Sequence, residues 1–145
     1  MRVPNSENLQ ISATYLRILA REHADPSGIL AELGVEDSVA SDSETVSVSD
    51  FFALVRAVDE CHSDRAWHLE YAHRTADHFH GPLTFAMMSA PTIGEGLGAI
   101  GRYMSIRASY LRSGTSRTGR DFSIELIESQ DLGDIRHLLL EITFR

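Results

Sequence analysis

The sequence lacks the features that mark secreted and membrane proteins. It contains one cysteine, Cys61, which cannot form a disulfide within the chain. No stretch approaches the roughly 20 consecutive apolar residues that a helix needs to span a bilayer. The first residues, Met1 to Glu7, contain no apolar run of the kind that signal peptides have. These absences predict a cytoplasmic protein without a membrane partner.

Basic residues are also scarce. The 145 residues include 13 Lys and Arg against 21 Asp and Glu, which gives a formal net charge of -8 at pH 7. Because the DNA backbone is itself anionic, a domain that grips a duplex needs a surplus of Lys and Arg. The chain alone is therefore predicted not to bind DNA.

Length and composition indicate one folded unit. A chain of 145 residues can bury one hydrophobic core and is short for two. Its contents of 43% hydrophobic and 23% charged residues are ordinary for a globular protein. We expect a single domain over residues 1–145.

Helical spacing dominates the first half of the chain. Apolar residues recur at i, i+4, i+7 and i+8 from Ile11 to Leu19, which predicts a helix over 11–22. Similar patterns, with Pro26 at a helix start, Gly34 at a helix end and Ser49 as an N-cap, predict further helices. These helices cover residues 26–33, 49–61 and 64–74; the polar stretches 35–44 and 75–81 are predicted loops, and 83–90 suits a buried helix or a buried strand.

The spacing of the apolar residues changes in the second half of the chain. Thr92 and Glu95 have the spacing of a capping box, and a stripe from Ile93 to Met104 predicts a helix over 93–105. Alternation with period two then predicts a β-hairpin with strands 110–116 and 121–127, with Phe122, Ile124 and Leu126 on one face. A last helix begins at Gly133-Asp134 and is still apolar at the final residue, which suggests truncation. The predicted class is α+β: a mostly helical amino-terminal part, a β-hairpin and a carboxyl-terminal helix.

A glycine motif lies inside the helix predicted over 93–105. Residues 96–101 fit G-x-G-x-x-G, which in a dinucleotide-binding fold lies between a strand and a helix. Here the helix has already begun at Thr92, which disfavours a dinucleotide site. The alternative is that Gly94, Gly98 and Gly101 allow a neighbouring helix to approach closely.

Histidines gather in the middle of the chain. His62, His68, His73, His78 and His80 lie within twenty residues and raise the possibility of a metal site. Zinc sites use four fixed ligands, however, and the sequence has neither a C-x-x-C pair nor an H-E-x-x-H helix. No G-x-S-x-G elbow is present either, and Cys61 is adjacent to His62 in a way that points the two side chains apart on a helix. We predict no catalytic residues, no metal and no cofactor.

From His80 to Tyr103 the chain resembles a signature of the amino-terminal domain of AraC/XylS-type transcription regulators, in the subfamily whose effector domain is helical at its start and is called arabinose-binding. The elements that carry the resemblance are His80-Gly81, Leu83, Ser89-Ala90-Pro91-Thr92, Ile93, Glu95 and Arg102-Tyr103. A looser likeness covers nearly the whole chain. The helix of this sequence differs from that of the family at Gly96, Gly98 and Gly101.

The resemblance implies a regulatory function. It implies a helix over 83–89, a domain that continues past Arg145, and a carboxyl-terminal helix-turn-helix domain, absent from this chain, through which the parent protein binds DNA. The expected function is to bind a small-molecule effector and to form a homodimer. Members of the subfamily respond to diverse molecules, so the label does not imply a sugar.

Aromatic, sulfur and imidazole side chains supply the predicted effector contacts. Tyr, Trp and His combine apolar bodies with polar tips that orient a ligand. The residues predicted to contact the effector are Trp67, Tyr71, His80, Met87 and Tyr103. Two other classes of function stay open: a small histidine-rich metalloprotein or enzyme, and a purely structural dimerisation module.

Overall fold

The fold is given by a computed structural model that describes residues 9–40, 45–62, 66–79, 81–119 and 121–144. Within these ranges, no helix combines the length and the apolar character needed to cross a membrane. Helices with two small antiparallel strand pairs and a final helix confirm the α+β class.

The first half of the chain builds a helical body on a short two-stranded ribbon. Strand β1 pairs antiparallel with β2, so that Ile11 lies opposite Val46. The elements of this half are, in chain order, β1 (Gln10–Ser12), α1 (Ala13–Ala20), α2 (Pro26–Glu32), α3 (Glu36–Ala40), β2 (Thr45–Ser47), α4 (Val48–Cys61) and α5 (Trp67–Phe79).

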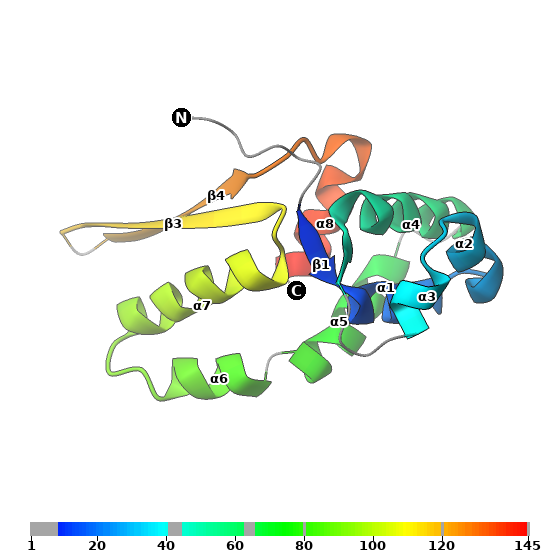
Figure 1. The fold of residues 1–145 in the computed structure, drawn as a ribbon. Coiled ribbons are helices and arrows are strands. Elements are labelled where there is room, and N and C mark those ends of the chain that lie inside the picture. The colour runs from blue at the N-terminus through cyan, green and yellow to red at the C-terminus, as the bar shows by residue number, and fades with distance from the viewer. Residues whose placement is uncertain (1–8, 41–44, 63–65, 80, 120, 145) are drawn as a thin grey trace.

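The second half forms an arm and then returns to the body. The arm consists of α6, α7 and the β3–β4 hairpin; Figure 1 shows α7 lying between the hairpin and α6, while α8 lies within the body, where it packs against α5. The elements are α6 (Gly81–Met88), α7 (Ile93–Arg107), β3 (Leu111–Thr118), β4 (Asp121–Glu128), the 3-10 turn η2 (Gly133–Ile135) and α8 (Arg136–Phe144).

The first helix starts later than its periodicity predicted. Ser12 has extended backbone angles and its hydroxyl accepts the N–H of Thr14, so α1 begins at Ala13. Ile11, the first residue of the predicted stripe, belongs to strand β1. The prediction of one helix over 11–22 is therefore wrong at its amino-terminal end, because a single apolar residue fits either period.

The N-cap of α4 is Ser47 rather than Ser49. The Ser47 hydroxyl accepts the N–H of Asp50 at 3.0 Å and donates to the Asp50 carboxylate at 2.7 Å. Ser49 lies within the first turn of the helix. Because both serines precede the same apolar stripe, only the extended backbone at Ser47 decides which one caps the helix.

The segment 35–44, predicted to be a loop, contains helix α3. Its Val39 is buried, and the Val39 carbonyl accepts from Nε and Nη2 of Arg17 at 2.9 and 2.7 Å. This paired contact attaches the end of α3 to α1. Residues 41–44 lie outside the described part of the chain.

The predicted loop over 75–81 is also wrong for the residues that the structure describes, because α5 continues to Phe79 and α6 begins at Gly81. Thr75 is buried, and its hydroxyl donates to the backbone carbonyls of Tyr71 and Ala72 at 3.0 Å. This back-bonding satisfies a polar side chain inside a helix. Residue 80 lies outside the described ranges.

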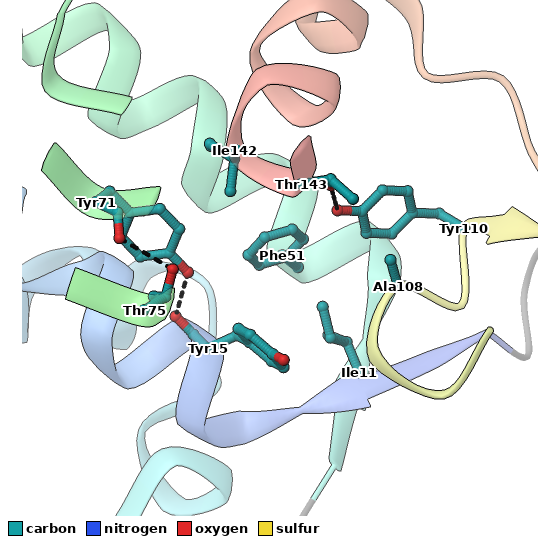
Figure 2. A pocket seen from close by; sticks show the side chains of 9 residues that line it. All are labelled: Ile11, Tyr15, Phe51, Tyr71, Thr75, Ala108, Tyr110, Ile142 and Thr143. Carbon is teal, nitrogen blue, oxygen red and sulfur yellow. Dashed lines mark hydrogen bonds between the residues drawn. The ribbon is translucent and has the colours of Figure 1, made fainter. Parts of the chain in front are cut away.

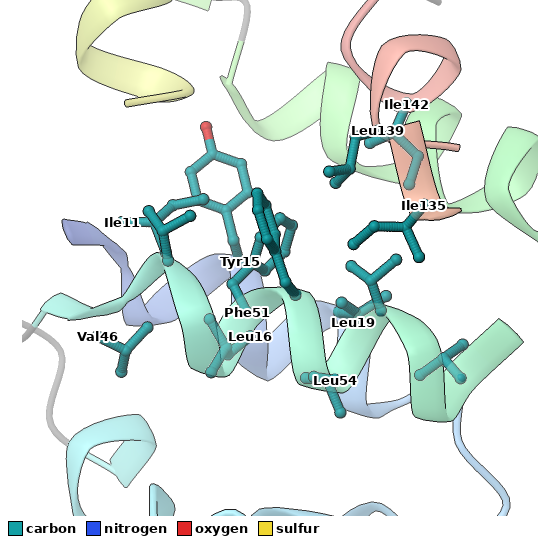
Figure 3. Close-up of a cluster of buried hydrophobic side chains, with 14 of the residues drawn as sticks. Ile11, Tyr15, Leu16, Leu19, Val46, Phe51, Leu54, Ile135, Leu139 and Ile142 are labelled. Carbon is teal, nitrogen blue, oxygen red and sulfur yellow. The ribbon is translucent and has the colours of Figure 1, made fainter. Parts of the chain in front are cut away.

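The core lies where α1, α4, α5 and α8 meet (Figure 3). The stripe predicted on α4 is confirmed, since Phe51, Leu54, Val55 and Val58 are all buried. Burying one such side chain contributes about 1.5–3 kcal/mol relative to leaving it exposed. The body therefore has a continuous apolar centre around α4.

An ion pair fastens α4 to the turn before α8. Arg56 Nε donates to Asp134 Oδ1 at 3.0 Å. The hydrogen bond from this guanidinium is the main reason that the pKa of the Asp134 carboxyl lies below its usual value. Any stabilisation it contributes is present above the usual pKa of an aspartate and is lost as the pH falls through the lowered one.

The hairpin turns one face toward α7. Phe122, Ile124 and Leu126 pair across the ladder with Arg117, Thr115 and Ser113, and paired residues share a face of the sheet. Ser113 and Thr115 are the side chains nearest to Gly101 of α7. The prediction that the three apolar residues of β4 share a face is confirmed, although Ile124 and Leu126 stay partly exposed.

The glycines of α7 differ in what surrounds them. A Cβ at Gly101 would lie 2.7 Å from the Ser113 hydroxyl, which donates to the Gly101 carbonyl at 2.8 Å. A Cβ at Gly98 would meet only Arg102 Nη1, at 3.9 Å. Close approach thus applies at Gly101, where the neighbour is a strand and not the predicted helix, and the prediction is wrong for Gly98.

Gly98→Ala is expected to raise the free energy of unfolding by up to about 1 kcal/mol, because alanine has the higher helix propensity. Gly101→Ala should give no such gain, because the new methyl group displaces Ser113 from its hydrogen bond, which offsets a similar amount. Urea denaturation of both variants beside the parent protein measures the difference. Equal gains in the two variants would contradict the close packing of α7 on β3.

Candidate functional site

A cavity lies at the centre of the body, where segments far apart in the sequence meet (Figure 2). Its apolar wall consists of Ile11, Phe51, Ala108 and Ile142, and its hydroxyl-bearing wall consists of Tyr15, Tyr71, Thr75, Tyr110 and Thr143. The cavity volume is about 20 Å³, which is room for about one water molecule. In this arrangement the cavity does not hold a metabolite, so a larger occupant requires a wall to move.

Local structure fixes the hydroxyl-bearing residues in place. Tyr71 and Thr75 are one helical turn apart on α5 and therefore face the same side. Tyr110 directly precedes β3, and its carbonyl accepts the N–H of Ser129 at 2.8 Å, which closes the base of the hairpin. Its ring lies over Phe51, with centroids 6.3 Å apart.

Hydrogen bonds join these hydroxyl groups to the backbone. The Tyr71 hydroxyl donates to the Tyr15 carbonyl at 3.2 Å, linking α5 to α1. The Thr143 hydroxyl donates to the Leu139 carbonyl at 2.6 Å, and the Tyr110 hydroxyl lies 3.3 Å from Thr143 Oγ1. The cavity is therefore bordered by an ordered polar network within an apolar core.

The lining is uncharged. Among the described residues, none of the side chains that line the cavity is an acid, a histidine, a lysine or an arginine. A buried charge without a partner is strongly unfavourable. The chemistry available at this site is hydrogen bonding and aromatic packing.

Of the five residues predicted to contact an effector, Tyr71 lines the cavity. Trp67 is buried, at 4% exposed, and does not line the cavity; its ring centroid lies 6.4 Å from that of Tyr71. Met87 of α6 is 39% exposed, and Tyr103 of α7 is half-buried; neither lines the cavity. His80 lies outside the described residues.

Sequence reasoning missed most of the cavity. Tyr15 was assigned to a core stripe, and Thr75, Tyr110 and Thr143 were not singled out. Their one shared signal is a hydroxyl group within or beside an apolar pattern, which does not distinguish a ligand site from a threonine or tyrosine of the core.

Two histidines of the predicted cluster, His62 and His68, contact neighbouring segments of the body. His62 Nε2 lies 2.8 Å from the Glu22 carbonyl, and the His62 ring stacks on Trp67. His68 is buried, and its Nε2 lies 2.5 Å from Glu141 of α8. In the described part of the chain, no three His, Cys, Asp or Glu side chains gather in a way that could hold a metal ion.

A second hollow lies between the amino-terminal half of α7 and the tip of the hairpin. Its lining includes Ile93, Arg102, Arg117 and Phe122. Ile93 is 82% exposed, although it was predicted to start the inward stripe of α7, because this end of the helix lies away from the body. The G-x-G-x-x-G residues lie inside α7, which begins at Ile93, and not at the turn after a strand that a dinucleotide site requires.

Comparison with known families agrees with the resemblance. The family model described as the arabinose-binding domain of AraC transcription regulators, N-terminal, matches residues 24–145. This match covers most of the chain, and the chain belongs to that family. The family is one of regulatory domains and not of enzymes. No curated protein matches the chain.

Proposed function

We propose that this chain is the effector-sensing and dimerisation domain of a cytoplasmic AraC-type transcription regulator, and that the effector binds at the central cavity. DNA binding would be carried out by a helix-turn-helix domain outside these 145 residues, in keeping with the net charge of -8. Tyr71 is the predicted contact that lines the cavity; Trp67, His80, Met87 and Tyr103 stay predictions.

The observation that carries this proposal is the set of elements that the cavity joins. Its lining comes from β1, α1, α4, α5, the turn after α7 and α8. An occupant of the cavity would contact all of these elements at once. A ligand changes a conformational equilibrium only through a difference in affinity between two arrangements, and a site with walls from so many elements provides such a difference.

The small volume of the cavity supports a coupled mechanism. With room for about one water molecule, the cavity must expand when a metabolite enters. The moving wall would shift α5 or α8, which are joined by the contact between His68 and Glu141. Expansion would thus be transmitted to helix packing and, in a dimer, to the contact between subunits.

The test is a thermal-shift screen of a metabolite library against this chain, repeated on Ala108→Val. Ala108 is 3% exposed and lines the cavity, so the two added methyl groups would take up the cavity volume. We expect at least one metabolite to raise the Tm of the parent chain, with an affinity at least tenfold lower in Ala108→Val, which is about 1.4 kcal/mol.

Ala86→Val is the matched control, because Ala86 is exposed on α6 and does not line the cavity. It should bind the same metabolite as the parent chain does. A metabolite that binds Ala108→Val as tightly as the parent chain would place the effector elsewhere. A library without any binder would argue for a purely structural module.

A further inference from the structure

We propose that the second hollow, between α7 and the β3–β4 hairpin, binds a small carboxylate with an apolar body, which Arg102 and Arg117 hold at its charged end. This site is separate from the central cavity, and it does not depend on the effector site proposed there. The proposal starts from the distribution of charge along the chain.

Basic residues gather in one part of an acidic chain. Residues 81–120 contain five arginines and one acidic residue, Glu95, although the whole chain has a formal net charge of -8. Two of these arginines, Arg102 of α7 and Arg117 of β3, line the second hollow. A local surplus of positive charge attracts anions, whereas the rest of an acidic surface repels them. The hollow is therefore a place where an anion can bind this chain.

The pleat of the hairpin turns two acids away from the hollow. Arg117 lies opposite Phe122 in the ladder, and both residues are on the face that turns toward α7. Side chains alternate between the two faces of a strand, so Asp121 and Glu125 are on the opposite face. Glu128 shares the face of Phe122 but lies at the other end of β4. Positive and negative side chains near the tip of the hairpin are thus separated between its two faces.

Both guanidinium groups are exposed and can reach a ligand. Arg117 Nε donates to the Gly119 carbonyl at 3.2 Å, which orients the side chain through one of its three nitrogens. Arg102 Nη1 lies along α7, 3.9 Å from the position that a Cβ of Gly98 would take. Among the residues that the structure describes, neither arginine forms an ion pair with an acid. The planar fork of a guanidinium matches the two oxygens of a carboxylate.

The lining also determines how much charge the ligand should have. Arg102 and Arg117 contribute two positive charges and Glu95 one negative charge, which leaves an excess of one positive charge. A monocarboxylate neutralises this excess. A phosphate monoester, with a charge of about -1.5 to -2 at pH 7, would place additional negative charge beside Glu95. A single carboxylate is therefore the expected anionic group.

Apolar side chains border the same hollow. Ile93 is 82% exposed and Phe122 is half-buried, and both belong to the lining. The Phe122 ring lies beside Gly94, 3.9 Å from the position of a Cβ there. The hollow has a volume of about 820 Å³, which lies within the range of small-molecule sites. A ligand that covers these side chains removes apolar surface from water, so we expect its body to consist of one or two rings.

The test compares three probes on the chain of 145 residues at pH 7: 2-naphthoate, its neutral counterpart 2-naphthamide, and acetate, which has the charge without the rings. Affinities come from NMR titrations, in which the amides of Gly94 and Gly98 report on the hollow. We expect 2-naphthoate to bind about tenfold more tightly than either of the other probes, because it alone has both the charge and the apolar body. Its affinity should fall as added salt screens the arginines.

Substitutions test the role of each charge. Arg102→Gln and Arg117→Gln should each lower the affinity for 2-naphthoate about three- to fivefold, as expected for an exposed charge pair, and leave that for 2-naphthamide unchanged. Arg21→Gln is the matched control, because Arg21 is exposed on the body and does not line the hollow. Glu95→Gln should raise the affinity for 2-naphthoate severalfold, since it removes a like charge while glutamine still suits a capping box. A merely structural role of Glu95 would not produce this gain.

Several outcomes would overturn the anion site. One is equal affinity for 2-naphthoate and 2-naphthamide, and another is a loss in Arg21→Gln as large as in Arg102→Gln and Arg117→Gln. The site is also overturned if 2-naphthoate does not bind, or if it binds only at the central cavity, so that Ala108→Val abolishes its binding. None of these results would affect the effector site proposed at the central cavity.

Discussion

Phe51→Ala is expected to lower the free energy of unfolding by about 3–5 kcal/mol, the usual cost of removing a buried phenylalanine ring. Phe51 of α4 is 2% exposed, and its ring faces Tyr110 in the turn that precedes β3. Its ring packs on Phe52 and Tyr110 at centroid distances of 6.2 and 6.3 Å. Removing it loses both the transfer free energy and these aromatic contacts.

The residues around Phe51 are not expected to move in and fill the space that Phe51→Ala leaves, so the lost stability is not recovered. Phe51 already borders an incompletely filled space, so its removal enlarges a void whose other walls are held by hydrogen bonds between helices. Urea denaturation gives the free energy of unfolding and its slope, and a changed slope would reveal a more open native state.

Phe85→Ala is the matched control for Phe51→Ala. Phe85 is 75% exposed on α6, and its truncation should change the free energy of unfolding by no more than about 0.5 kcal/mol. Similar losses in the two variants would mean that α6 is covered in solution by a second copy of the chain or by another partner.

The elements with long apolar patterns were predictable from the sequence. Helix α4 has four inward residues on one stripe, and α7 begins with a Thr92 hydroxyl that accepts the N–H of Glu95 at 3.2 Å, as the capping-box spacing indicated. The hairpin followed from strict alternation on β4. In each case, the local pattern and the tertiary packing favour the same structure.

The short elements were not predictable for a physical reason. Strands β1 and β2 have three residues each, too few for a period to be recognised, and they are stable only because each pairs with the other across 35 residues of chain. Helix α3 is held by Arg17 of α1 rather than by its own pattern. Such contacts depend on the finished fold.

For the candidate site, the sequence predicted the kinds of side chain but not which of them come together. Aromatic and hydroxyl side chains on apolar patterns are visible in the sequence, and Tyr71 was singled out on this basis. The convergence of Tyr15, Tyr71, Tyr110 and Thr143 joins residues that span most of the chain. No periodicity within one helix encodes that convergence, because it depends on how α1, α5, α8 and the turn before β3 meet.

Trp67→Ala is expected to destabilise the chain by about 3–5 kcal/mol, and Trp67→Phe by about 1–3 kcal/mol. The indole ring fills the space between α4 and α5, and its Nε1 donates to Asp59 Oδ1 at 2.9 Å. Phenylalanine can keep the ring contacts with His62 and Tyr71 but cannot supply that donor. The Asp59 carboxylate, which is half-buried, then loses a protein hydrogen bond.

A double-mutant cycle with Asp59→Ala isolates this hydrogen bond. If the Trp67–Asp59 bond accounts for the cost of Trp67→Phe, that cost should largely disappear in the Asp59→Ala background, and an undiminished cost would assign it to ring packing alone. Trp67 does not line the cavity, so Trp67→Phe should leave the affinity for a cavity ligand within about twofold, less than the tenfold that one hydrogen bond represents. A larger loss of affinity at unchanged stability would instead make Trp67 an effector contact and would extend the site from the cavity toward the junction of α4 and α5.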